Sequence, residues 1–129
     1  MTKEEEKESI CSYIETALWS SPCESEGIDF LDQEYSIEDF DESTLSNMKK
    51  EMVEFINKHY YLVDSSDDDT SYSMFAHNLW LTRNGHGTGF WDGDYKYGEE
   101  LTAECEKLNC INLYVGDDGK IYSWWDVVV

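Results

Sequence analysis

The sequence predicts an α+β fold of about four helices followed by a C-terminal β-hairpin. In the helical segments, apolar residues recur at spacings of three and four, which places them on one face of a helix. Two short runs at 111–115 and 120–125 are rich in β-branched and aromatic residues, which is typical of strands. The 129 residues suit a single domain. We expect an acidic helical half over about 1–70, and a glycine-rich loop, a helix and the hairpin over about 71–129.

The first helix is predicted from its start signal and its apolar stripe. Thr2 and Glu5 fit a capping box, in which each side chain accepts a hydrogen bond from a free backbone N–H of the other. The apolar stripe then recurs at helical spacing, and it consists of Ile10, Tyr13, Ile14, Ala17 and Leu18. The segment 20–22, Ser-Ser-Pro, ends the helix.

The second helix is predicted to start after Ser43 or Thr44, either of which can cap it, and to run to about residue 62. Its apolar residues recur at helical spacing, and they are Leu45, Met48, Met52, Phe55, Ile56 and Tyr60. Between the first two helices, the acidic segment 24–42 also contains apolar residues. We interpret that segment as loop and short helix, with its apolar residues facing inward.

The third and fourth helices are predicted from shorter patterns. Asp69 or Thr70 is expected to cap a helix over 71–83, and Asn84-Gly85 supplies a left-handed stop. A last helix is predicted over Glu99–Asn109. The two strands then follow, joined by Gly116-Asp-Asp-Gly119, whose residues are typical of a hairpin turn.

The charge excludes several functions. Acidic residues number 29 and basic residues 9, for a net charge of −20. Binding to a nucleic-acid backbone needs clustered Lys and Arg, and an anionic membrane surface repels the same charge. The sequence contains no run of about 18 apolar residues, so we expect no membrane-spanning helix. The acidic start predicts no export signal, so we expect a cytosolic protein with its four cysteines reduced.

Thirteen of the 29 acidic residues gather in two runs that contain no basic residue. The first run lies within 24–42, and its members are Glu24, Glu26, Asp29, Asp32, Glu34, Glu38, Asp39, Asp41 and Glu42. The second run consists of Asp64, Asp67, Asp68 and Asp69. Small domains stay soluble with a net charge of about 2–8 in magnitude. The excess here therefore suggests a partner-binding acidic surface, although a solvated face that keeps the protein soluble explains the same composition.

The second half contains a long motif, 76–92, which reads Ala-His-Asn-Leu-Trp-Leu-Thr-Arg-Asn-Gly-His-Gly-Thr-Gly-Phe-Trp-Asp. A Leu-Tyr-Val-Gly-Asp-Asp-Gly-Lys-Ile-Tyr hairpin follows at 113–122. Over about 71–123 the chain resembles small, mostly uncharacterised proteins encoded by bacteriophages. The resemblance implies a phage origin and the cytoplasm of a bacterial host, and it implies no reaction.

The glycine-rich loop is a second candidate site. Its motif residues are Arg83, Asn84, His86, Trp91 and Asp92. In an enzyme or a ligand-binding protein, His86 would act as a general base oriented by Asp92. A strong nucleophile is missing, since Thr82 and Thr88 are weak candidates.

A structural role explains the same loop. Glycines at 85, 87 and 89 permit positive φ angles, Phe90 and Trp91 would anchor the loop to the core, and Arg83 would pair with Asp92. We expect this structural role, and we expect no catalytic residue.

No metal or cofactor is expected. Cys105 and Cys110 have no second ligand pair at zinc spacing, and we interpret them as reduced cysteines packed like small apolar residues. Asp117 and Asp118 fall short of the six to eight oxygen ligands that calcium takes, so they are interpreted as turn residues.

These observations favour a small, acidic phage accessory protein that binds and inhibits a host protein. The expected target is a restriction, CRISPR, nuclease or repair protein with a basic nucleic-acid-binding surface, blocked by mimicry of DNA. Mimicry requires the carboxylates to cluster on one face, and a homodimer would extend that face. The alternatives are a small enzyme or ligand binder using Arg83, His86 and Asp92, and a phage structural or assembly protein.

Overall fold

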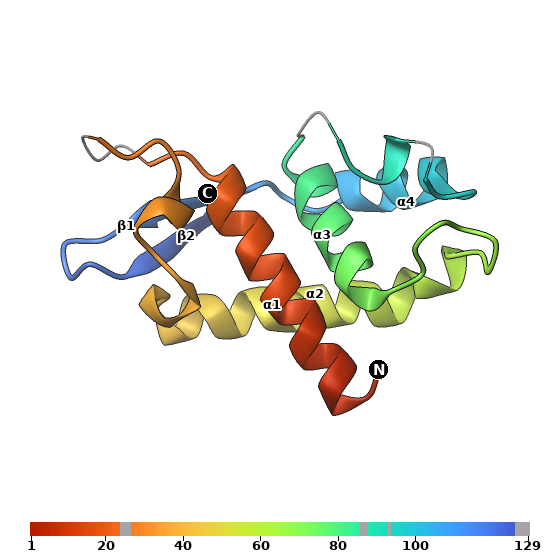
Figure 1. The fold of residues 1–129 in the computed structure, drawn as a ribbon, viewed down its shortest axis with the longest axis horizontal. Coiled ribbons are helices and arrows are strands. Elements are labelled where there is room, and N and C mark those ends of the chain that lie inside the picture. Colours follow the sequence, from red (N-terminus) through yellow and green to blue (C-terminus); the bar gives the residue numbers. More distant parts are fainter. Residues whose placement is uncertain (24–26, 86–87, 93, 126–129) are drawn as a thin grey trace.

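The computed structural model describes residues 1–23, 27–85, 88–92 and 94–125, with only the backbone of residues 92, 124 and 125. In this part of the chain, four α-helices precede an antiparallel β-hairpin (Figure 1), which confirms the predicted α+β fold. The elements are α1 (Lys3–Ser20), α2 (Glu42–His59), α3 (Tyr72–Arg83), α4 (Gly98–Glu106), β1 (Ile111–Val115) and β2 (Ile121–Trp125). Among these helices, none is both long and apolar enough to cross a membrane.

The start of α1 has the predicted capping box. Thr2 Oγ1 accepts a hydrogen bond from the Glu5 backbone N–H at 3.1 Å, and the Glu5 carboxylate accepts one from the Thr2 N–H at 2.8 Å. The inner face of α1, including Tyr13 and Ala17, is fully buried. The helix ends at Ser20, where Ser21 is extended ahead of Pro22, as a residue before proline prefers.

The core forms mainly where α1 crosses α3. Trp80 of α3 meets the Tyr13 ring edge-to-face with centroids 5.4 Å apart, and its indole N–H donates to Ser20 Oγ at 2.8 Å. The buried apolar residues form one cluster to which all four helices and both strands contribute. Ile111 and Ile121 carry the hairpin into that cluster.

The cap of α2 differs from the prediction. Asp41, not Ser43 or Thr44, precedes the helix, and its carboxylate accepts a hydrogen bond from the Thr44 N–H at 3.1 Å. The Asp41 backbone N–H also donates to the Ile121 carbonyl of β2 at 3.0 Å. This tertiary bond fixes where the chain leaves the acidic segment and enters α2. The helix ends at His59, and the 3₁₀ helix η3 (Tyr60–Leu62) continues it.

The cap of α3 also differs. Ser71 Oγ accepts from the Met74 N–H at 3.2 Å, so Asp69 and Thr70 were wrong predictions. The predicted left-handed stop is confirmed, because Gly85 has φ of +70°. The last helix, α4, starts one residue before the prediction and ends at Glu106, three residues before it.

The acidic segment is folded, as expected, around short helical turns. These are the 3₁₀ helices η1 (Leu31–Gln33) and η2 (Ile37–Asp39). Leu31 and Phe40 are buried, but Phe30 is 44% exposed, so the expectation that the apolar residues of this segment face inward is wrong for Phe30. One isolated bridge pairs Phe30 with Pro22, and another pairs Phe40 with Ile121. The segment is thus attached to the end of α1 and to the hairpin.

The hairpin has the predicted strands and turn. Ile111 pairs with Trp125 and Val115 with Ile121. The Gly116 N–H donates to the Lys120 carbonyl at 2.8 Å, and Gly119 has φ of +79°, a conformation that favours glycine.

Candidate functional site

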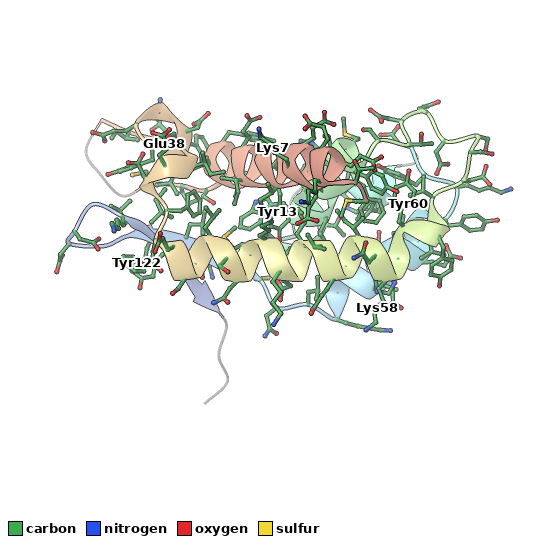
Figure 2. All side chains as sticks on the ribbon, turned by 90° about the horizontal axis from the view of Figure 1, so that it is seen from below. Lys7, Tyr13, Glu38, Lys58, Tyr60 and Tyr122 are labelled. Carbon is green, nitrogen blue, oxygen red and sulfur yellow. The ribbon has the colours of Figure 1, made fainter. Side chains whose placement is uncertain are left out.

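The two acidic runs lie at opposite ends of the long axis. Residues 27–42 lie at the left end of Figure 1, and the loop 63–71 lies at the right end. Figure 2 shows the η1–η2 region and this loop on the upper side, with α1 between them. Helix α2, with Lys58, lies below. Glu24 and Glu26 lie outside the described residues.

Five carboxylates of the two runs bind backbone N–H groups. Asp39 accepts from Ser36 at 2.8 Å, as Asp41 does from Thr44. In the second run, backbone N–H groups also donate to three carboxylates, those of Asp64, Asp67 and Asp69. Hydrogen bonds from Ser66 lower the pKa of Asp64, and hydrogen bonds from Ser71 lower the pKa of Asp69. These carboxylates therefore hold the local fold.

The other six described carboxylates of the runs are exposed. Their side chains make no hydrogen bond or ion pair with another described residue. They are Asp29, Asp32, Glu34, Glu38, Glu42 and Asp68. Five belong to the first run. Helix α1 adds the exposed and unpaired Glu4, Glu8 and Glu15. We call these nine the free carboxylates.

The cations that form ion pairs in the described part of the chain bind other carboxylates. Lys49 of α2 lies 3.6 Å from Glu6. Lys107 lies 2.9 Å from Glu104. Arg83 pairs with Glu51 inside the protein. The negative charge of the free carboxylates is therefore left uncompensated by these internal ion pairs.

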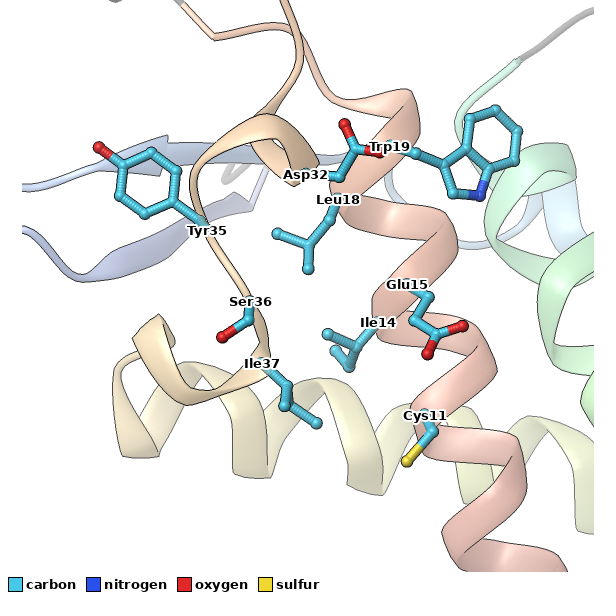
Figure 3. Close-up of a pocket in the computed structure, with 9 residues that line it drawn as sticks. All are labelled: Cys11, Ile14, Glu15, Leu18, Trp19, Asp32, Tyr35, Ser36 and Ile37. Atoms are coloured by element: carbon cyan, nitrogen blue, oxygen red, sulfur yellow. The ribbon is translucent and has the colours of Figure 1, made fainter. Parts of the chain in front are cut away.

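A groove opens beside the first acidic run. It lies between α1 and the η1–η2 region and has a volume of about 420 Å3. Figure 3 shows Ile14, Leu18 and Ile37 converging on it, with Asp32 leaning toward α1. Its lining is completed by Cys11, Glu15, Trp19, Tyr35 and Ser36. No signal in the sequence predicted this groove, because its two walls come from segments about 20 residues apart.

The described part of the glycine-rich loop is packed against α3. Thr82 Oγ1 accepts a hydrogen bond from the Phe90 N–H at 3.0 Å. A Cβ added at Gly89 would lie 2.3 Å from the same hydroxyl oxygen, so no larger residue fits there without movement. Phe90 is fully buried, as predicted, but Trp91 is 52% exposed. The prediction that Trp91 anchors the loop is therefore wrong.

Arg83 is buried against the segment between α4 and β1 rather than displayed in the loop. Its guanidinium donates to the carboxylate of Glu51, to the Asn109 carbonyl and to the Tyr13 hydroxyl, the last at 3.3 Å. Burial raises the pKa of Tyr13 to about 12, so that hydroxyl stays neutral. Among the described residues Arg83 forms its ion pair with Glu51. The side chain of Asp92, the expected partner, lies outside the described residues.

Asn84 has a structural role too. Its side-chain oxygen accepts from the Ile111 N–H at 2.8 Å, and its amide donates to the Trp80 carbonyl at 2.9 Å. These bonds join the end of α3 to the start of β1. His86 lies outside the described residues, so the geometry proposed for a general base there is not described.

The cysteines are free thiols. Cys105 is buried, as predicted, and burial raises the pKa of its thiol to about 12. Cys110 is exposed, which corrects the prediction that it packs like a small apolar residue. Among the residues that the structure describes, no group of three or more His, Cys, Asp or Glu side chains could hold a metal ion.

Comparisons of the chain with protein-family models, with curated proteins and with solved structures found no match.

Proposed function

We propose that this protein binds a host protein with a basic nucleic-acid-binding surface and blocks that surface by occupying it. The observation that supports the proposal is the set of nine free carboxylates on α1 and the two acidic runs. Unpaired, exposed charges repel one another and cost stability. A cationic partner would relieve that repulsion.

The number of free carboxylates, rather than their density, supports mimicry of DNA. The accessible surface of 7781 Å2 divided among 29 acidic residues gives about 270 Å2 for each, which is sparser than duplex DNA. Helix α1 alone, with 18 residues, is about 27 Å long, and that length of duplex carries about 16 phosphates on both strands. A protein bound to one side of DNA meets about half of these. The nine free carboxylates are similar in number, but only three of them lie on α1 and the others lie on the segments beyond it, so they match the phosphates of a longer stretch of duplex at a lower density.

The first experiment captures the target. Lysate of a bacterial host is passed over the immobilised protein at about 0.1 M salt, and bound proteins are eluted with a salt gradient. We expect one dominant DNA-binding or defence protein that duplex DNA displaces and whose activity on DNA the chain inhibits. Binding should weaken steeply with salt, because the attraction is between exposed charges.

Two results would overturn the proposal. One is a broad smear of basic proteins leaving at low salt, which means that the charge serves solvation. The other is a captured protein that binds with the same affinity at low and high salt, since mimicry of phosphates requires salt dependence.

A further inference from the structure

We propose that the groove between α1 and the η1–η2 region receives an arginine side chain of the basic partner. This inference rests on the proposed function and names the contact at its centre. The groove combines an aliphatic floor with two free carboxylates, those of Glu15 from α1 and Asp32 from η1 (Figure 3).

The floor suits the stem of a long side chain. Ile14 and Leu18 of α1 lie almost fully buried beneath the groove, so its accessible apolar surface comes mainly from the half-buried Ile37 and Tyr35 and from Trp19, which is 42% exposed. A volume of about 420 Å3 lies in the range of sites that enclose small molecules, about 300–1,000 Å3. The methylene groups of arginine pack on such a floor while the charged end stays near water.

The two carboxylates at the rim of the groove favour a side chain with a positively charged end. Glu15 and Asp32 are both exposed and unpaired among the described residues, so a cationic occupant gains their attraction, whereas an apolar occupant does not. Arginine offers five donors in a planar fork and is weakly hydrated, whereas the lysine ammonium is a strongly hydrated point charge. A site with an apolar floor and carboxylates on two walls therefore favours arginine.

The occupant has to come from another kind of chain. Arg83 is the only arginine in the sequence, and its guanidinium is buried against Glu51 and the Asn109 carbonyl. Neither this molecule nor a second copy can place a guanidinium in the groove. A homodimer therefore does not satisfy the site.

The probe for the test is Nα-acetyl-arginine N-methylamide, added to ¹⁵N-labelled full-length protein at low salt and followed by NMR. The lysine and norleucine analogues are added in parallel. We expect arginine to shift the backbone signals of residues 14–19 and 32–37, with a dissociation constant at least threefold lower than that of lysine. The norleucine analogue should bind more weakly than either.

Matched variants assign the shifts to the groove. Glu15→Gln with Asp32→Asn should weaken arginine binding by up to about fivefold for each lost charge, the range of exposed ion pairs. Glu54→Gln with Glu100→Gln removes the same charge from exposed residues that belong neither to the groove lining nor to the free carboxylates and should leave arginine binding within twofold. All four residues are exposed, so both variants are expected to fold, which the NMR spectrum itself verifies.

Three results would overturn the inference. These are equal binding of arginine and lysine, equal losses in the two double variants, and binding of norleucine as tight as that of arginine. The test is separable from the proposed function. Arginine binding in the groove with no basic protein captured from lysate refutes the function alone. Capture of a DNA-displaced protein whose affinity the Glu15 and Asp32 changes leave unaltered refutes the groove alone.

Discussion

The acidic runs 27–42 and 64–69 have similar compositions but use their carboxylates differently. In the loop 64–69, three of the four aspartates accept hydrogen bonds from backbone N–H groups, and only Asp68 is free. In 27–42, five carboxylates are free and only Asp39 and Asp41 bind backbone. The fold of 27–42 comes instead from buried Leu31 and Phe40.

The comparison distinguishes carboxylates that stabilise the fold through hydrogen bonds from carboxylates that are exposed and available to a partner. A carboxylate that binds a backbone N–H loses a local bond when it is neutralised. A free carboxylate loses only repulsion from its neighbours. Neutralising the two runs should therefore have opposite effects on stability, and the first run, which holds five of the nine free carboxylates, should matter more for a partner than the second.

The largest expected effect is on binding of the captured partner. A fourfold variant carries Asp29→Asn, Asp32→Asn, Glu34→Gln and Glu38→Gln. Its affinity should fall about fourfold to several hundredfold, because four exposed ion pairs worth about 0.2–1 kcal/mol each are lost. Its melting temperature should be equal to or above that of the wild type. Titration calorimetry and thermal unfolding measure the two quantities.

The control for this variant removes four exposed carboxylates elsewhere. They are Glu54, Glu100, Glu106 and Asp117. Affinity should change less than threefold, although the net charge changes equally. Equal losses of affinity in the two variants would show that binding depends on the total charge of the protein and not on the first acidic run.

The next effect concerns Asp67, which joins two loops. Its carboxylate accepts from the Asp64 N–H and from the Lys96 N–H, both at 2.9 Å. Asp67→Ala should lower the free energy of unfolding by about 1–2 kcal/mol, because two charged hydrogen bonds are lost. Asp68→Ala, one residue away and free, should leave it unchanged within about 0.5 kcal/mol. Urea unfolding of the pair checks this, and equal losses would contradict it.

A smaller effect is expected inside the first run, at its one helix cap. Asp41→Ala should cost about 1 kcal/mol, the usual loss for an N-cap. Glu42→Ala should cost only a few tenths of a kcal/mol, because Glu42 merely faces the positive end of the helix dipole. A loss at Glu42 as large as that at Asp41 would mean that the free carboxylates also hold the fold. Chemical unfolding of both variants distinguishes the cases.

The smallest effect is the response to acid. The pKa values of Asp64 and Asp69 are lowered in the folded protein by hydrogen bonds from Ser66 and Ser71. Their contribution to stability is therefore complete above the unfolded pKa of about 3.9 and is lost as the pH falls through the lower folded value. The double variant Asp64→Asn, Asp69→Asn should lose less stability than the wild type between pH 5 and pH 3. If thermal melts showed the same loss of stability in the double variant and in the wild type, the hydrogen bonds assigned to Asp64 and Asp69 would be contradicted.

Sequence reasoning succeeded where the signals were local. The Thr2 capping box and the Gly116–Gly119 turn involve residues within five positions, and both are confirmed. The prediction of the α2 cap failed because Asp41, Ser43 and Thr44 are all residue types that cap helices well. Asp41, which caps the helix in the structure, also donates its backbone N–H to the distant Ile121 carbonyl, a contact that the local sequence does not reveal.

The rest of the candidate site depends on contacts between distant segments. Arg83 reaches Tyr13, Glu51 and Asn109, none of them near it in sequence, so the only ion-pair partner that its sequence neighbourhood suggested was Asp92. The groove likewise needs α1 to lie across 32–37. The division of the acids into binding and free carboxylates also follows from geometry that composition does not contain.

The two backbone bridges that attach Phe30 to Pro22 and Phe40 to Ile121 have a consequence for conformational entropy. Ordering a free chain costs about 1–2 kcal/mol for each residue, and here that ordering is complete before any partner arrives. A synthetic peptide of residues 27–42 would present the same charges yet have to order itself on contact. It should dissociate far faster than the whole protein, because preorganisation lowers the cost of association.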